Sequence, residues 1–206
     1  NPTHYGEFLI KTPWVISDST ANWNWNGMEG KPAIVEVYAQ GDEVELFLNE
    51  TSLGKKPAGK EAGFRTLFET TYEPGTLVAV SYENGQEIGR SELATAGAER
   101  VLAVEQEAYA GLKHSEQELV YVQVEMRDQN GVLAADDNQK ITLSVDGEVE
   151  VLGFGSGNPK PNYNFNEGVT ELFGGRAQII LKKPAETVTL TVKAEDGTKG
   201  AITINK

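Results

Sequence analysis

The amino-acid sequence predicts an all-β protein that consists of two antiparallel β-sandwich domains in tandem. Short runs of alternating apolar and polar residues recur along the 206-residue chain, and this period is typical of strands with one buried face. Turn-forming residues separate these runs about every ten residues, which is the spacing expected of β-sandwiches. No segment places apolar residues at helical spacing over three turns.

Four strands are expected in the first half of the chain. The turn pair Asn84-Gly85 lies between two alternating runs, and this arrangement is the strongest short signal of a β-hairpin. A further turn signal is Glu73-Pro74-Gly75. The expected strands are Ala33–Tyr38, Glu43–Leu48, Thr76–Tyr82 and Gln86–Leu93.

The second half carries more strand patterns of the same kind. The run Leu119–Arg127 alternates after its first residue and ends at the turn Asp128–Gly131. The other expected strands are Lys140–Val145, Val149–Gly153, Ala177–Leu181, Thr187–Ala194 and Ala201–Ile204. All 8 prolines fall in expected loops or at strand ends, where no sheet hydrogen bond is lost.

A stretch of small residues, Ala94–Ala98, provides the best domain boundary because expected strands flank it on both sides. Each half then has the length of one seven-stranded immunoglobulin-like sandwich. We therefore expect one domain over residues 1–97 and a second over residues 98–206. Because the chain begins with Asn1-Pro2 and not with Met, we also expect it to be a fragment.

Charge and composition exclude several classes of partner. The chain carries 31 acidic and 18 basic side chains, which gives a net charge of −13. This charge repels nucleic-acid phosphates and anionic lipids, whereas a neutral sugar is compatible with it. No apolar run approaches the ~18 residues of a membrane helix, so membrane insertion is not expected. The absence of cysteine excludes disulfides and thiolate metal sites but leaves the compartment open, with a lean toward the outside or surface of a bacterial cell.

Motifs along nearly the whole chain occur in an order that is similar to the C-terminal part of family 2 glycoside hydrolases of the β-galactosidase type. The first half resembles the domain that follows the catalytic barrel, through Trp23–Pro32, Val35–Tyr38, Asp42–Asn49, Ser52–Lys55, Tyr72–Leu77 and Thr95–Gly97. The second half resembles the terminal immunoglobulin-like domain, through Leu119–Val122, Asp128–Gly131, Gly153–Pro159 and Phe173–Ala177. Two positions depart from the pattern. Asn49-Glu50 replaces an Asn-Gly turn, and Asn22 replaces a His before the first Trp.

The resemblance implies retaining hydrolysis by two glutamates at the strand ends of a catalytic (β/α)₈ barrel. Such a barrel needs roughly 250 residues and alternating helices, so both catalytic glutamates are expected outside this chain. We assign no catalytic residue here, and the barrel of the same polypeptide is the expected partner. The pair Asn49-Glu50 matches the Asn-Glu of the family's acid/base, but its place between Leu48 and Ser52 indicates an exposed turn carboxylate.

The chain has 3 tryptophans, and these are Trp14, Trp23 and Trp25. In an extended segment Trp23 and Trp25 share one face, since side chains two residues apart point the same way. They are candidates for stacking on a sugar, but packing in the domain core or against the barrel is the favoured interpretation because large aromatics dominate cores and interfaces. No carbohydrate-binding residue is therefore assigned.

Two further motifs are interpreted as loops without a ligand. The glycine-rich stretch Gly153–Asn158 lacks the Lys-Ser/Thr and the following helix of a phosphate loop, so we expect a tight loop that needs positive φ angles. Asp128, Asn130 and Asp136–Asn138 lack the spacing of an EF-hand, and a solvated loop is favoured over a calcium site. The 2 histidines, His4 and His114, lie in different halves. No metal site and no cofactor is expected.

The sequence thus indicates a non-catalytic accessory region that supports or shapes the barrel of a family 2 glycoside hydrolase and is inactive alone. The alternative is a stand-alone carbohydrate-binding or cell-surface adhesion module, because tandem immunoglobulin-like domains serve both purposes and fold alone does not separate them. The segment encoded before Asn1 would distinguish the two.

Overall fold

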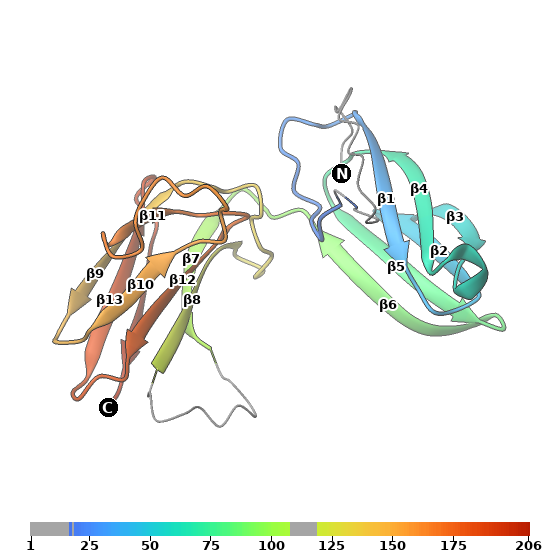
Figure 1. Cartoon of the computed structure of the whole chain (residues 1–206). Helices are drawn as coiled ribbons and strands as arrows, with labels where there is room; N and C mark the ends of the chain where they lie inside the picture. Colours follow the sequence, from blue (N-terminus) through green and yellow to red (C-terminus); the bar gives the residue numbers. More distant parts are fainter. Residues whose placement is uncertain (1–16, 18, 108–118) are drawn as a thin grey trace. The chain divides into compact units, whose positions relative to one another are not determined.

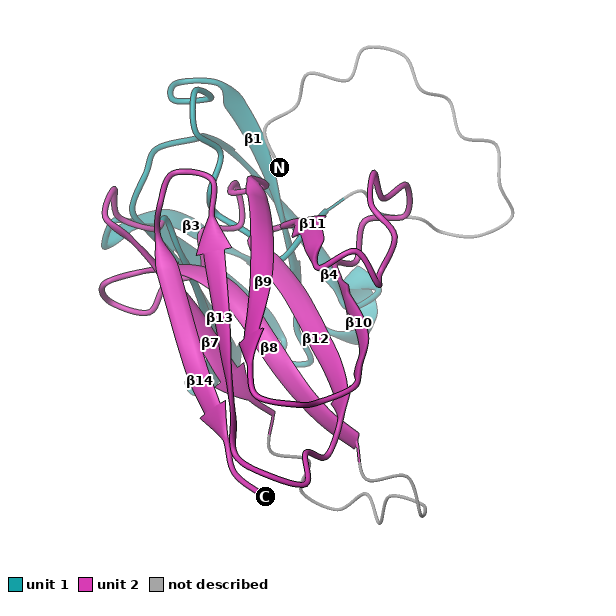
Figure 2. Ribbon diagram, turned by 90° about the vertical axis from the view of Figure 1, so that its left-hand side faces the viewer, with its two compact units in different colours: residues 1–95 teal, residues 96–206 magenta. Residues whose placement is uncertain are grey.

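The computed structural model describes residue 17, residues 19–107 and residues 119–206, and it confirms an all-β protein (Figure 1). The described residues form strands β1 to β14 and one short 3₁₀ turn, η1. The chain divides into two compact units, residues 1–95 and residues 96–206 (Figure 2). No helix among the described residues is long and apolar enough to cross a membrane.

The first unit pairs a two-stranded sheet with a four-stranded sheet, and every strand pair is antiparallel. The two-stranded sheet consists of β1 (Pro32–Tyr38) and β4 (Arg65–Thr71). The four-stranded sheet has the order β3 (Thr51–Pro57), β2 (Glu43–Leu48), β5 (Thr76–Glu83) and β6 (Gln86–Ala94). The turn η1 (Lys60–Ala62) connects β3 to β4.

The core of the first unit follows from the alternation along β2. Val44, Leu46 and Leu48 are buried, while the residues between them are only partly covered. Phe68 of β4 packs into the same cluster. Because alternate residues of a strand point to opposite faces, one apolar face per sheet is sufficient to build this core.

The second unit is a sandwich of two four-stranded sheets, which Figure 2 shows as two layers. One sheet has the order β10 (Val151–Gly155), β12 (Arg176–Lys182), β8 (Leu119–Asp128) and β7 (Arg100–Gln106). The other has the order β11 (Val169–Glu171), β9 (Lys140–Asp146), β13 (Val188–Ala194) and β14 (Lys199–Ile204). Val122, Ile179 and Leu190 are fully buried between the sheets.

Four strands were not expected from the sequence: β3, β4, β7 and β11. Strand β3 has no buried residue, so the alternation that marks a strand is absent from it. Strand β11 spans only three residues, which is too short to show a pattern. Strand β10 lies two residues further along the chain than the expected Val149–Gly153, because its pairing with β12 starts at Val151 and continues as far as Gly155.

Candidate functional site

Trp23 lies in the core of the first unit and not on a surface that a sugar could reach. The residue is 1% exposed, and its indole N–H donates to the backbone carbonyl of Glu73 at 3.0 Å. Its backbone carbonyl accepts a hydrogen bond from the Thr95 hydroxyl at 2.5 Å. Because the ring is buried and both the indole N–H and the backbone carbonyl are hydrogen-bonded inside the unit, Trp23 anchors the segment that precedes β1.

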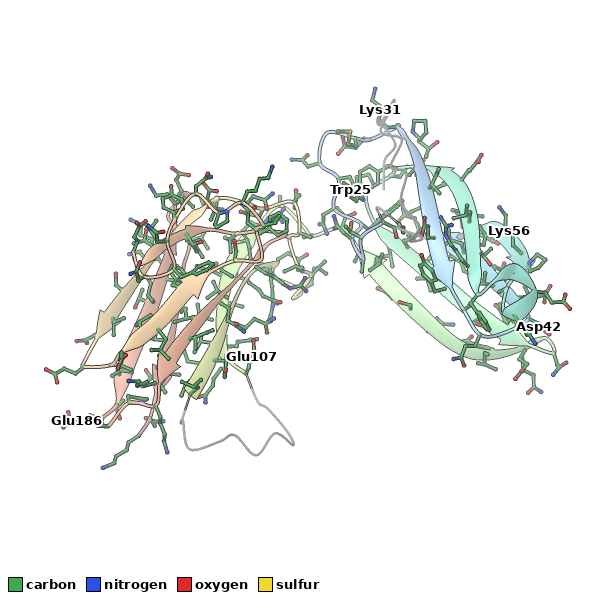
Figure 3. All side chains as sticks on the ribbon, in the orientation of Figure 1. Trp25, Lys31, Asp42, Lys56, Glu107 and Glu186 are labelled. Atoms are coloured by element: carbon green, nitrogen blue, oxygen red, sulfur yellow. The ribbon has the colours of Figure 1, made fainter. Side chains whose placement is uncertain are left out.

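Trp25, which is labelled in Figure 3, follows on the same segment. It is half-buried and packs against the core cluster that contains Trp23. Its backbone N–H donates to the hydroxyl of Tyr72 at 3.1 Å. Its indole N–H is buried and has no hydrogen-bond partner within the described ranges. The other residues considered from the sequence, Trp14, His4 and His114, lie outside the described residues.

Asn49-Glu50 forms the turn between β2 and β3. Both residues have positive φ angles, 49° and 66°, as a tight two-residue hairpin turn requires. The Asn49 side chain accepts the N–H of Thr76 at 2.9 Å and donates to the carbonyl of Pro74 at 3.1 Å. Glu50 is exposed, so this Asn-Glu pair shapes a turn and its carboxylate faces solvent.

Asp128 binds backbone groups of its own loop and the backbone of Gly97. Asp128 accepts the N–H groups of Gly97 at 2.8 Å, Asn130 at 2.8 Å and Val132 at 2.9 Å. The Gly97 N–H is the largest of the causes that lower the pKa of Asp128, since it stabilises the charged form. Within the described parts of the chain, no cluster of three or more His, Cys, Asp or Glu is arranged to hold a metal ion.

The prediction of a positive-φ loop at Gly153–Asn158 is wrong for its glycines. Gly153 and Gly155 lie in strand β10, and Gly157 also lacks a positive φ. Close packing explains Gly155, because a Cβ there would lie 2.4 Å from the ring of Phe165. Phe165 is 55% exposed, and its backbone carbonyl accepts the N–H of Phe154 at 2.7 Å. The small residues of β10 therefore make room for an exposed aromatic ring on the outer face of the sheet.

A network of polar side chains covers the outer face of β8 and β12 next to that ring. Glu125 is at its centre and accepts hydrogen bonds from Gln123 Nε2 at 2.8 Å, Arg176 Nε at 2.9 Å and Arg127 Nε at 2.7 Å. Burial by itself raises the pKa of Glu125, but the two guanidinium groups outweigh this effect and the pKa is lowered. Glu125 is therefore a fixed anion that orients its three partners.

A groove of about 510 Å³ opens on this face of the second unit. Strand register brings Gly155, Gln178 and Gln123 into one row across β10, β12 and β8. Phe165 and Leu152 form an apolar side of the groove, and the remaining lining residues include Glu107, Gln123, Arg176, Gln178 and Ile180. Its volume falls in the range of roughly 300–1,000 Å³ that is usual for small-molecule sites.

The described carboxyl groups with a shifted pKa do not have the raised pKa that the general acid of a glycosidase requires. Among the described residues, the pKa is lowered at five carboxyl groups, which are Glu36, Glu87, Glu125, Asp128 and Asp196. In each case hydrogen bonds to arginine or to backbone N–H groups stabilise the charged form. A general acid for glycoside cleavage instead requires a raised pKa, so that the group is protonated at neutral pH.

Each of the two units matches a protein-family model. Residues 103–203 match the family model described as "Glycoside hydrolase family 2 C-terminal domain 5". Residues 30–89 match a model described as "Domain of unknown function (DUF4982)". The two matches follow one another in the order of the two units.

Two curated relatives cover most of this chain. Beta-galactosidase BoGH2A of Bacteroides ovatus is 27% identical over 182 residues, which are 85% of this chain and 21% of the relative. A protein of Formosa agariphila named "Putative beta-glucuronidase" is 32% identical over 165 residues, which are 76% of this chain and 16% of that protein. The chain thus spans about a fifth or less of the length of these relatives.

Solved structures are similar over nearly the entire chain. A glycosyl hydrolase family 2 member from Bacteroides cellulosilyticus has a TM-score of 0.83 and 26% identity, and the match covers 98% of this chain and 27% of that one. A beta-glycosidase from Bacteroides vulgatus has a TM-score of 0.75 and 26% identity over 90% of this chain and 24% of its own.

Proposed function

This chain belongs to glycoside hydrolase family 2, as part of its C-terminal region, and on that premise we propose that it is a non-catalytic accessory region of a β-galactosidase-type enzyme. Its partner is the catalytic barrel of the same polypeptide, which it braces or whose cleft it shapes. The observation that carries the proposal is the match of residues 103–203 to the family 2 C-terminal domain, within a chain that spans about a fifth or less of its curated relatives.

The chemistry of the described residues supports an accessory role. Retaining glycosidases use two carboxyl groups about 5–5.5 Å apart, one of which is protonated and donates to the leaving group. The described carboxylates with a shifted pKa are all held ionised, and Glu50 of the Asn-Glu pair faces solvent in a hairpin turn. The relative from Bacteroides ovatus supports a β-galactosidase, and the one from Formosa agariphila is the reason to test a β-glucuronide as well.

The test measures hydrolysis of nitrophenyl β-galactoside, β-glucuronide and β-mannoside. We expect no turnover by the 206-residue chain alone, and turnover of the β-galactoside by the polypeptide encoded by the whole gene. Glu50→Gln is the matched variant in both proteins and should change neither result. Turnover by the isolated chain that survives purification and is lost in Glu50→Gln would refute the accessory role. A gene that encodes further sandwiches before Asn1 instead of a barrel would also contradict it.

A further inference from the structure

We propose that the groove on the outer face of β8, β10 and β12 binds a neutral oligosaccharide. This site lies outside the accessory role proposed above, which does not depend on it. The groove combines an exposed aromatic side, a row of amide side chains and two groups of opposite charge, and each feature matches one property of a sugar chain.

The polar side of the groove offers both hydrogen-bond donors and acceptors. Gln178 donates its amide to Glu107 at 2.8 Å, and Gln123 donates to Glu125 at 2.8 Å. Two kinds of group then have no hydrogen-bond partner within the described ranges. The acceptors are the side-chain carbonyl oxygens of both glutamines and the second carboxylate oxygen of Glu107. The donors are the terminal nitrogens of Arg176. A sugar hydroxyl is both donor and acceptor, so neighbouring hydroxyls can satisfy this mixed row.

The network behind the row fixes these side chains before a ligand arrives. Glu125 holds Gln123 and Arg176 through hydrogen bonds of 2.8 and 2.9 Å and is itself 7% exposed. Side chains that are already ordered lose less conformational entropy on binding, which favours affinity. Glu125 is thus a positioning residue, and the side chains that would touch the ligand are those of Gln123 and Arg176.

The apolar side suits the C–H face of a pyranose ring. Phe165 is 55% exposed and Leu152 is 43% exposed, and both line the groove. The face of an aromatic ring carries partial negative charge, which attracts the partially positive C–H groups of the sugar. Gly155 holds this ring close to the sheet, because any larger residue at that position would push it away.

The charge of the lining favours a neutral ligand over an acidic one. Arg176 and Glu107 are the charged residues that line the groove, and they carry opposite signs. The Arg176 guanidinium is ion-paired with Glu125 at 2.9 Å, so it offers no uncompensated positive charge to an anionic ligand. A chain with a net charge of −13 repels an anionic polysaccharide, so an uncharged oligosaccharide is the class that the site fits.

The experiment is an amide NMR titration of the 206-residue chain with the neutral sugars β-1,4-galactotetraose and cellotetraose, with tetragalacturonic acid as the acidic arm. We expect saturable shifts in β8, β10 and β12 with at least one neutral sugar. Phe165→Ala and Gly155→Ala should each weaken binding about tenfold, which corresponds to the loss of one aromatic contact. Gln178→Ala should also weaken it.

Val145→Ala is the matched control, because Val145 is 38% exposed in the same unit but lies on β9 of the other sheet and does not line the groove. Its affinity for the sugar should equal that of the unchanged chain, and the NMR spectra show directly that each variant is folded. The proposal is overturned if no neutral sugar produces saturable shifts, if only tetragalacturonic acid does, or if the shifts map outside the groove. It is equally overturned if Phe165→Ala binds like Val145→Ala.

Discussion

The rings of Trp23 and Tyr72 meet edge-on in the core of the first unit, with their centroids 5.1 Å apart and their planes at 69°. The Tyr72 hydroxyl also donates to the carbonyl of Trp23 at 3.4 Å and accepts the N–H of Trp25 at 3.1 Å. Tyr72, which directly follows β4, therefore fixes the segment that precedes β1. Edge-to-face pairs of this kind contribute about 0.5–1.5 kcal/mol beyond the burial of the rings.

Trp23→Ala should lower the free energy of unfolding by about 3–5 kcal/mol, because it removes a fully buried aromatic side chain. Trp25→Ala is the matched variant two residues away, and its loss should be smaller, about 1–2 kcal/mol, since that side chain is only half-buried. Urea unfolding of both variants measures the difference. A loss at Trp25 that equals or exceeds the loss at Trp23 would show that the aromatic anchor is assigned to the wrong residue.

Alternation made some strands predictable from the sequence, but it does not account for all of them. Strand β6 buries no residue and was predicted beside the Asn84-Gly85 turn, whereas β4 and β7 alternate and were missed. The alternation along β2 and β8 is visible because each places apolar residues on one buried face. Strand β3 buries no residue and is held by its pairing with β2, which a local pattern cannot reveal. Strand β7 buries Leu102 and Val104 beside the unit boundary, so a visible alternation was missed there.

The groove of the second unit could not be predicted, because folding brings its residues together from distant parts of the chain. Phe165 lies on a loop, and its place over Gly155 depends on the pairing of its backbone with Phe154. One signal was present, since glycines inside a strand often mark a close approach by another group. A loop interpretation of those glycines gives no reason to expect an exposed aromatic ring beside them.

Asp128→Ala should destabilise the second unit by about 2–4 kcal/mol, because three backbone N–H groups lose their acceptor in a residue that is 4% exposed. Asp128→Asn keeps one acceptor oxygen and should cost less. Asp146→Ala is the control, because Asp146 is exposed. Its free energy of unfolding should lie within about 0.5 kcal/mol of that of the unchanged chain. Thermal or urea unfolding followed by circular dichroism distinguishes the three. Equal stability of Asp128→Ala and Asp146→Ala would contradict the role of Asp128.

Glu36 should make the first unit sensitive to acid. Arg65 at 2.6 Å is the main cause that lowers the pKa of Glu36 from 4.5 to about 2, and Tyr38 and Ser17 also donate hydrogen bonds to it. A lowered pKa in the folded state adds stability above the unfolded pKa, and this stability is lost as the pH falls from about 4.5 to about 2.

An NMR titration of the Glu36 carboxyl carbon measures this pKa directly. Its midpoint should lie near pH 2 in the unchanged chain and should rise toward the ordinary value in Arg65→Ala. Glu36→Gln should flatten the loss of stability between pH 4.5 and 2, whereas Glu50→Gln, which changes an exposed turn residue, should leave it unchanged. A Glu36 midpoint near 4.5 in the unchanged chain would refute the ion pair as the cause.

We predict that residues 96–206 fold alone and are more stable than residues 98–206, which the sequence-based boundary would produce. Ala96 is 9% exposed and packs in the core of the second unit, and the Gly97 N–H donates to Asp128 at 2.8 Å. Thr95 instead belongs to the first unit, because its N–H donates to the carbonyl of Gly75 at 2.8 Å. A cut after Gly97 removes the Ala96 contact and leaves Asp128 without one of its donors.

The free energies of unfolding of the two fragments should differ by about 1–3 kcal/mol, which is the usual cost when a buried charged group loses a hydrogen-bond partner. Urea unfolding of both fragments measures it, and their amide NMR spectra show whether each is folded. Residues 1–95 serve as the companion fragment and should also give a dispersed spectrum, because Trp23, Tyr72 and Thr95 all remain in it. If residues 96–206 are unfolded while the 206-residue chain is folded, the second unit depends on the first and is not an independent domain. If both versions of the second unit are equally stable, Ala96 and Gly97 contribute nothing to it, and the boundary between residues 97 and 98 is as good as the one between residues 95 and 96.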